Sequence, residues 1–160
     1  MVLPARVVSG LVRGELPPAP FAYDAGTFAE DRPVLVLRDR QLQDDPASEP
    51  WLLRAVVLRV TGEVVGRIGL HAPPDATGTV EVGYVVAPAH RRRGYAREAV
   101  QGLLGWAAAH GATRCLASVS PGNAASLALV RQLGFVQVGE HVDEVDGLEL
   151  VHALDLAGTR

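Results

Sequence analysis

The residues with the clearest chemical potential lie between positions 84 and 97. Here a β-type run ends at Pro88, three consecutive arginines follow, and Gly94 opens a helical pattern. A chain that passes from a strand into a helix presents backbone N–H groups without intrahelical acceptors at the positive end of the helix dipole. Such a turn binds anions, most often phosphates. The alternative is a solvated basic turn ahead of an ordinary helix.

Two other phosphate-binding motifs are absent from the sequence. No Gly-x-x-x-x-Gly-Lys-Ser/Thr occurs, which argues against a P-loop nucleotidase, and no Gly-x-Gly-x-x-Gly occurs, which argues against dinucleotide binding. The single cysteine, Cys115, excludes an internal disulfide and a cysteine-rich metal site, and we expect no metal. We expect Cys115 to be a small core residue on a strand.

A second polar group opens the short helix that the pattern predicts from 123 to 133. Asn123 and Ser126 share a helical stripe with Val130 and Leu133. Asn123 could be the N-cap, with Ser126 bonding back to the helix. Both could instead face a ligand between this helix and the preceding strand. Asn123 can do both, because its backbone can cap while its side chain reaches outward.

The order and spacing of these motifs resemble the GNAT N-acetyltransferase superfamily. Arg91-Arg-Arg-Gly-Tyr-Ala96 matches the family signature (Gln/Arg)-x-x-Gly-x-(Gly/Ala), and Asn123-x-x-Ser126 and Leu133-Gly-Phe135 stand where the family has Asn-x-x-Ser/Ala and Gly-Phe. Glu81-Val-Gly-Tyr84 and Arg97-Glu-Ala99 are similar to the branch that includes ribosomal-protein N-terminal acetyltransferases. The match covers about residues 51–156.

The resemblance implies transfer of an acetyl group from acetyl-CoA to a primary amine, a peptide N-terminus or a small amine, by direct attack in a ternary complex. The alternative is a non-catalytic acyl-CoA-binding sensor or interaction module on the same fold. By position, the backbone of Tyr84, Val85 and Val86 would bind the pantetheine arm and acetyl carbonyl. Asn123 would contact the pantetheine or its thiol end, and Ser126 would also bind the cofactor there. The pyrophosphate would be held by Arg91, Arg92, Arg93, Gly94, Tyr95, Ala96 and Arg97.

Acetyl transfer also needs a group that takes the amine proton and a group that protonates the leaving thiolate. Glu81 is the candidate base, and its alternative role is a surface or substrate-orienting glutamate. Ser126 is the nearest candidate to the leaving sulfur. The chain departs from the family at two positions: Val130 stands where many members have a tyrosine donor, and Ser118 where one branch has a glutamate base.

Two histidines receive structural interpretations. His152 is flanked by leucines on one face of the last predicted strand, which favours a hydrogen-bonded core residue over one that borders the acceptor site. His90 lies in the arginine loop, where we expect it to pack or cap.

The elements that must position these residues follow from periodicity and turn signals. We expect a helix from about Gly94 to His110 with a clean apolar stripe, and a closing hairpin that turns around Asp146-Gly147. The remaining expected segments are helices at 3–13 and about 31–43, strands at 51–60, 64–71, 79–87 and 113–120, and hairpin strands at 135–142 and 148–156. This order predicts a mixed α/β (α+β) fold. The resemblance adds a mostly antiparallel central sheet flanked by helices, with the strands at 79–87 and 113–120 splayed to admit the cofactor.

Length and composition set the class. The chain has 160 residues, 21% charged and 48% hydrophobic, which predicts one soluble domain at 1–160, with a helical part at 1–50 and a core at 51–156. The single cysteine and the lack of a secretory signal or a long apolar run lead us to expect a cytoplasmic protein without membrane contact. Its oligomeric state is left open between monomer and homodimer. The net charge of −3 and 5% aromatic content argue against a nucleic-acid partner. All basic residues are arginine, and acidic stretches at 24–49 and 137–149 suggest a cationic acceptor or a plain solvated surface.

Overall fold

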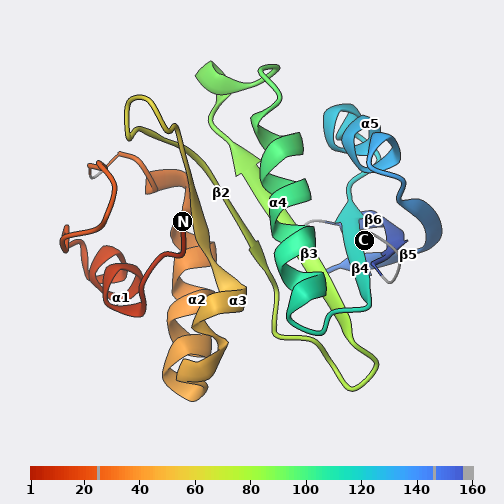
Figure 1. The fold of residues 1–160 in the computed structure, drawn as a ribbon, viewed down its shortest axis with the longest axis horizontal. Helices are drawn as coiled ribbons and strands as arrows, with labels where there is room; N and C mark the ends of the chain where they lie inside the picture. Colours follow the sequence, from red (N-terminus) through yellow and green to blue (C-terminus); the bar gives the residue numbers. More distant parts are fainter. Residues whose placement is uncertain (25, 146, 157–160) are drawn as a thin grey trace. The chain divides into compact units, whose positions relative to one another are not determined.

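The computed structural model describes residues 1–24, 26–145 and 147–156. The chain forms two compact units: unit 1 comprises Met1–Gly69 and Tyr84–Tyr95, and unit 2 comprises Leu70–Gly83 and the residues from Ala96 onward. Figure 1 shows the chain in the colours of its sequence. Because the chain passes between the units three times, neither unit is a continuous segment.

The strands form a six-stranded sheet in the order β1-β2-β3-β4-β6-β5. β1 pairs with β2, β4 with β6, and β5 with β6, all antiparallel, whereas β3 pairs with β4 in parallel. The mixed, mostly antiparallel sheet predicted from the sequence is therefore confirmed. The strands are β1 (Arg54–Val57), β2 (Val64–Leu70), β3 (Thr79–Val86), β4 (Arg114–Val119), β5 (Val136–Asp143) and β6 (Gly147–Asp155).

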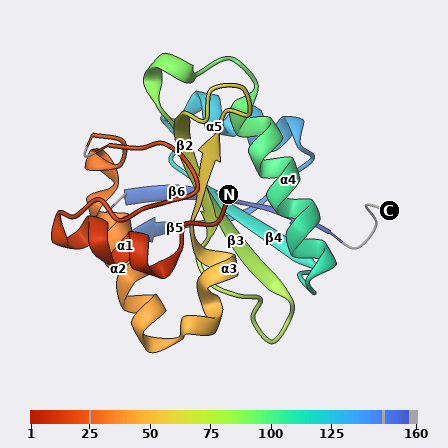
Figure 2. The same cartoon turned by 60° about the vertical axis from the view of Figure 1, so that its left-hand side comes forward.

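In unit 1, α1 (Ala5–Arg13) and α2 (Arg32–Asp44) lie side by side, as Figures 1 and 2 both show. α1 ends at Gly14, whose φ of 80° is the left-handed conformation that terminates many helices. α2 carries a proline in its first turn, where proline is favoured. The core of this unit consists of Leu3, Val8, Phe21, Phe28, Leu35, Leu42, Leu52, Leu53 and Ala55.

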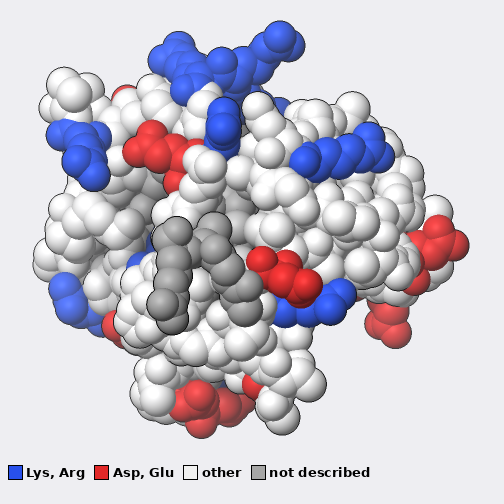
Figure 3. All heavy atoms as spheres, turned by 45° about the vertical axis from the view of Figure 1, so that its right-hand side comes forward, with Lys and Arg blue, Asp and Glu red and all other residues white. Residues whose placement is uncertain are grey.

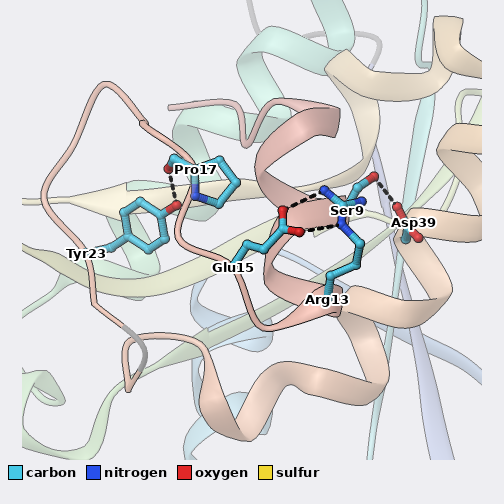
Figure 4. Close-up of polar contacts among 6 residues, drawn as sticks. All are labelled: Ser9, Arg13, Glu15, Pro17, Tyr23 and Asp39. Carbon is cyan, nitrogen blue, oxygen red and sulfur yellow. Dashed lines mark hydrogen bonds and ion pairs between the residues drawn. The ribbon is translucent and has the colours of Figure 1, made fainter.

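Polar contacts fasten the chain around α1, and Figure 4 shows them. The Arg13 guanidinium donates two hydrogen bonds to Glu15, of 3.0 and 2.8 Å. The Ser9 hydroxyl donates to the Asp39 carboxylate of α2, and the Tyr23 hydroxyl donates to the carbonyl of Pro17. The proline-rich segment after α1 is thus held by specific contacts.

The strand predicted from Trp51 to Val60 is wrong at both ends. Trp51 belongs to a short helix, α3 (Glu49–Leu52), because Pro50 occupies its first turn, where proline is favoured. At the other end, the N–H of Gly62 donates to the carbonyl of Leu58 at 2.8 Å and closes a turn. Only Arg54–Val57 remains as strand, and Val2 pairs with Arg54 in an isolated bridge.

In unit 2, α4 (Tyr95–Ala109, of which Tyr95 belongs to unit 1) buries its predicted apolar stripe, and Gly111 follows it with a φ of 99°. α5 (Ala124–Gln132) packs against β4, where buried Cys115, Ala117 and Val119 alternate with Leu116 and Ser118 on the other face. β5 and β6 form the predicted closing hairpin. Of its predicted turn, Asp146 lies outside the described residues, and Gly147 has a φ of 74°.

The parallel ladder between β3 and β4 joins Thr79, Val80 and Glu81 to Arg114, Cys115 and Leu116. Both strands continue beyond this ladder, to Val86 and Val119. The splay predicted for the two strands therefore stays a prediction beyond Glu81. Within the described part of the chain, no helix is both long and apolar enough to cross a membrane.

Candidate functional site

The arginine loop connects β3 to α4 through a 3₁₀ turn, Pro88–His90. Arg92 has a φ of 61°, which is uncommon for a residue with a Cβ, and Gly94 has a φ of 84°. The Arg91 Nε donates a 2.9 Å hydrogen bond to the carbonyl of Val86, so the first arginine is fastened to the end of the strand. The backbone is thereby folded into a turn immediately before the first turn of α4.

The arginine side chains of this loop are exposed. Arg91, Arg92, Arg93 and Arg97 are all exposed, and Gly94 between them has open space where a Cβ would stand. Figure 3 shows basic side chains gathered at the top, where Figure 1 draws the connection between β3 and α4. The first N–H groups of α4 have no intrahelical acceptors. Positive side chains, free N–H groups and an unfilled glycine fit a bound pyrophosphate.

The end of β3 lies very close to β2 at Gly66. A Cβ on Gly66 would stand 2.2 Å from the carbonyl oxygen of Val85 and 3.0 Å from the Cα of Val86. The N–H of Ala87 donates to the carbonyl of Val65 at 2.9 Å and fixes this approach. Sequence reasoning missed Gly66, although a glycine inside a strand pattern is a known signal of close backbone approach.

His90 packs, as its sequence context predicted. Its Nε2 lies 3.2 Å from Glu63 Oε1, and the ring side chain is 18% exposed. Glu63 belongs to the turn between β1 and β2. The contact fastens the start of the arginine loop within unit 1.

Asn123 is the N-cap of α5. Its side-chain oxygen accepts a 3.1 Å hydrogen bond from the N–H of Ser126, so the capping interpretation is confirmed. Asn123 is exposed and Ser126 is half-buried. Val130, at the position of the family's tyrosine donor, is 1% exposed. It belongs to the core of unit 2.

Glu81 on β3 and Ser118 on β4 are in direct contact. The Ser118 hydroxyl donates a 2.6 Å hydrogen bond to Glu81 Oε1, and His71 Nδ1 lies 3.5 Å from Glu81 Oε2. The hydrogen bond from His71 holds the pKa of Glu81 below its ordinary value, and Ser118 adds to this effect against the opposing effect of burial. Glu81 is therefore a carboxylate at neutral pH.

Sequence reasoning found Glu81 but missed His71, which directly follows the last residue of β2. Its proximity to Glu81 depends on the pairing of two strands, since the His71 N–H donates to the Glu81 carbonyl at 2.8 Å. Ser118, noted only as a departure from the family pattern, is a hydrogen-bond donor to the candidate base.

Two other residues with reactive side chains, His152 and Cys115, belong to the core. His152 is 1% exposed, and its Nδ1 lies 3.1 Å from the carbonyl of Leu150, which confirms the structural interpretation. Cys115 is fully buried, and burial raises the pKa of its thiol to about 12. A thiol with that pKa is not a nucleophile at neutral pH. In the three described segments, no three His, Cys, Asp or Glu side chains are grouped as metal ligands.

The first acidic stretch is largely engaged in structure. Asp31 pairs with Arg67 at 2.5 Å, and Glu49 accepts a 2.8 Å hydrogen bond from the N–H of Ala5. Asp24 and Asp45 accept bonds from backbone N–H groups in their own turns. These contacts give the carboxylates structural roles within unit 1 that do not depend on a bound substrate. A cationic acceptor substrate therefore stays a prediction.

Comparison with known proteins places these features in a family. A family model described as an acetyltransferase (GNAT) domain matches residues 24–136, more than half of the chain. The uncharacterized N-acetyltransferase YjdG of Bacillus subtilis is 34% identical over 89 residues, which cover 55% of this chain and 51% of that protein. The L-2,4-diaminobutyric acid acetyltransferase of Nocardia farcinica is 33% identical over 102 residues, 59% of this chain and 53% of that protein. The chain thus spans about half the length of the curated relatives it matches.

Solved structures share the fold. A ribosomal-protein-S5-alanine acetyltransferase from Vibrio fischeri has a TM-score of 0.68 at 16% identity, over 100% of this chain and 93% of that chain. A chimera of the spermidine N-acetyltransferase SpeG from Vibrio cholerae also has a TM-score of 0.68 at 16% identity, over 98% of this chain and 94% of that chain.

Proposed function

Because the chain belongs to the acetyltransferase (GNAT) domain family, we propose that it is an N-acetyltransferase that transfers an acetyl group from acetyl-CoA to a primary amine. The observation that carries the proposal is the arginine loop, in which Arg92 and Gly94 adopt positive φ and the arginine side chains are exposed. A turn of this kind at a helix N-terminus suits the pyrophosphate of coenzyme A.

We assign the donor side of the reaction to residues of the loop and of β3. Arg91 to Arg97 would hold the pyrophosphate, and Tyr84 to Val86 would bind the pantetheine arm through their backbone. Acetyl-CoA supplies an activated thioester, so much of the rate can come from positioning. The N–H of Val85 or Val86 would stabilise the oxyanion that forms when the amine attacks.

On the leaving-group side, Asn123 and Ser126 would contact the thiol end of the cofactor. Asn123 Oδ1 is already engaged with the N–H of Ser126, so its amide NH₂ is the group left for a ligand. The Ser126 hydroxyl would hydrogen-bond the leaving sulfur, although a serine is a weak acid at neutral pH.

For the acceptor, we propose a small cationic amine or a peptide N-terminus. The names of similar proteins mention L-2,4-diaminobutyric acid, spermidine and a ribosomal-protein alanine, and each offers an amine. Glu81, held as a carboxylate in unit 2, contributes a negative charge that would favour a cationic acceptor. A cytoplasmic location and a monomeric or homodimeric state stay predictions.

The test is a thiol-release assay with acetyl-CoA and four amines: L-2,4-diaminobutyrate, spermidine, glucosamine and an alanine-starting peptide. We expect acetyl-CoA to bind and at least one amine to accelerate release of free coenzyme A, with the acetylated amine found by mass spectrometry. Binding of acetyl-CoA without turnover on any amine would favour the non-catalytic module. Absence of binding would refute the proposal itself.

A further inference from the structure

His71 and Glu81 form a histidine–carboxylate pair within unit 2. His71 Nδ1 lies 3.5 Å from Glu81 Oε2, and Glu81 Oε1 accepts a 2.6 Å hydrogen bond from Ser118. Both carboxylate oxygens of Glu81 are thus engaged by neighbouring side chains. The His71 side chain is 50% exposed and the Glu81 side chain 30% exposed, so the histidine is the more accessible partner.

A glycine makes room for the histidine ring. A Cβ on Gly83 would stand 3.1 Å from His71 Nε2, tighter than ordinary van der Waals contact. Gly83 follows Glu81 by two residues, on the same face of β3. The ring therefore has Nδ1 beside Glu81 and Nε2 beside Gly83. In the sequence, Gly83 directly precedes Tyr84 to Val86, the segment that we assign to the acetyl group.

The His71–Glu81 pair resembles the histidine and the carboxylate of a three-member proton relay, in which the third member is the group that gives up its proton. A carboxylate beside Nδ1 favours the tautomer with the proton on Nδ1, which leaves the lone pair of Nε2 to accept a proton. Glu81 itself is a weak base, because its hydrogen bonds stabilise the ionised form. An imidazole nitrogen with a free lone pair can accept a proton and release it again, which suits a general base.

We propose that His71 Nε2 accepts the proton of the attacking amine and that Glu81 positions the His71 ring. This inference rests on the proposed acetyltransferase function. Nε2 takes one proton from the ammonium form of the acceptor, and the neutral nitrogen then forms a bond to the acetyl carbon. The bond between that carbon and the coenzyme A sulfur breaks, the thiolate leaves and takes up the second N–H proton, and the imidazolium returns its proton to water.

Other charged groups face the same pair. By strand register, His141 on β5 and Glu149 on β6 share the face of Ser118 and Glu81, and His141 Nε2 lies 3.4 Å from Glu149 Oε2. His141 also contributes to lowering the pKa of Glu81. The charge of His141 acts on Glu81, so the pH experiment compares variants in an otherwise unchanged background.

The kinetic test measures kcat/KM against pH for the best amine of the four-amine panel. In the wild type, we expect kcat/KM to depend less steeply on pH than in His71→Gln, because the base accepts the proton of the bound amine. In His71→Gln, we expect kcat to fall about 100-fold. Its kcat/KM should rise about tenfold per pH unit up to the ionisation of the amine, because only the neutral amine then reacts.

Two further variants distinguish a role in positioning the His71 ring from a role in stabilising the fold. Glu81→Gln should reduce kcat less than His71→Gln and leave KM for acetyl-CoA unchanged. Gly83→Ala should lower kcat without unfolding the protein, because the ring must give way by a few tenths of an ångström. His110→Gln is the matched control, since His110 stacks on Trp106 in α4, and it should keep the wild-type profile.

An activity-independent readout is the tautomer of His71, measured by ¹⁵N NMR at pH 8. We expect the proton on Nδ1 in the wild type and a mixture of tautomers in Glu81→Ala. A wild-type pH profile in His71→Gln, combined with loss of activity in Glu81→Gln, would assign the base to Glu81 and overturn the proposal. If no amine is acetylated, the proposed function fails and the proton-transfer role with it. The NMR result then still decides whether Glu81 orients the ring.

Discussion

Glu81 couples the candidate site to the stability of unit 2. Hydrogen bonds from His71 and Ser118 hold the pKa of Glu81 below its ordinary value of 4.5. A carboxyl group with a lowered pKa stabilises the folded state above its unfolded-state pKa, and this contribution is lost as pH falls through the folded-state pKa. The stabilisation from Glu81 is therefore present at neutral pH and begins to decline below about pH 4.5.

We expect Glu81→Gln to be less stable than the wild type at pH 7 and to approach it at pH 3.5. Urea unfolding at both pH values gives the two differences in unfolding free energy. Asp155→Asn, an exposed acid-to-amide change on β6, serves as the control. A constant difference between Glu81→Gln and the wild type at both pH values would contradict the lowered pKa.

Gly94 is the residue on which the arginine loop depends most directly. We expect Gly94→Glu to weaken coenzyme A binding by more than about tenfold, because it places a negative charge beside the pyrophosphate and a side chain at a φ of 84°. Isothermal titration calorimetry gives the dissociation constant.

The matched control is Gly105→Glu, which adds the same charge to an exposed position of α4 with open space around it. We expect it to bind coenzyme A like the wild type and to be slightly more stable, since glycine is unfavourable inside a helix. Equal affinity in Gly94→Glu and the wild type would remove the loop from the cofactor site.

At the scale of elements, the start of α5 tests two roles of Asn123. We expect Asn123→Ala to lose about 1 kcal/mol of stability, because the N-cap acceptor for the Ser126 N–H is removed. Asn123→Asp keeps the cap, so it should keep the stability while losing the amide NH₂. If only the cap matters, both thermal stability and coenzyme A affinity will be retained in Asn123→Asp; weakened affinity there supports a ligand contact.

The approach of β2 to β3 at Gly66 sets the position of the strand end. We expect Gly66→Ala to lose about 1–3 kcal/mol of stability, because the new Cβ would stand 2.2 Å from the Val85 carbonyl oxygen. Gly102→Ala in α4, with open space around it, should instead be neutral or stabilising. Thermal unfolding compares the two, and an unchanged midpoint in Gly66→Ala would show that the strands separate easily.

The sequence predicted the elements whose signals are local. α4 and its buried stripe, the N-cap at Asn123 and the closing hairpin all follow from spacing within one segment. The predicted strand at 51–60 failed at both ends. At its start, a proline in a helical first turn outweighed the β-rich composition, and at its end a turn closed by the Gly62 N–H replaced the strand.

The acid–base group could be predicted only in part, because its members are distant in sequence. Glu81 was found from its strand, but Ser118 lies 37 positions away and contacts it through the parallel ladder. His71 directly follows β2 and meets Glu81 through pairing across a turn. Register of this kind is a tertiary property that no local pattern contains.

For the whole molecule, charge is unevenly distributed. The net charge is −3, yet residues 91–97 carry four arginines and no acid. A negatively charged cofactor bound there would meet a positive loop on a protein whose net charge is negative. The loop's exposed charges are screened by salt, since the Debye length falls from about 10 Å at 0.1 M to about 3 Å at 1 M.

We expect the dissociation constant of coenzyme A to rise several-fold between about 0.05 and 0.5 M NaCl. Dephospho-coenzyme A, which has fewer charges, should show a shallower dependence. The measurement is calorimetric titration at several salt concentrations. An affinity independent of salt would mean that backbone N–H groups, rather than arginine side chains, provide the binding.

Cys115 offers a practical advantage to anyone who studies this chain. It is the single cysteine, it is fully buried in β4, and burial raises its pKa to about 12. A colorimetric reagent for free thiols will therefore report released coenzyme A with almost no background from the native protein. Because Cys115 is buried, an alkylating reagent can react with it only when β4 is transiently exposed to solvent. The rate of alkylation therefore measures how often β4 opens.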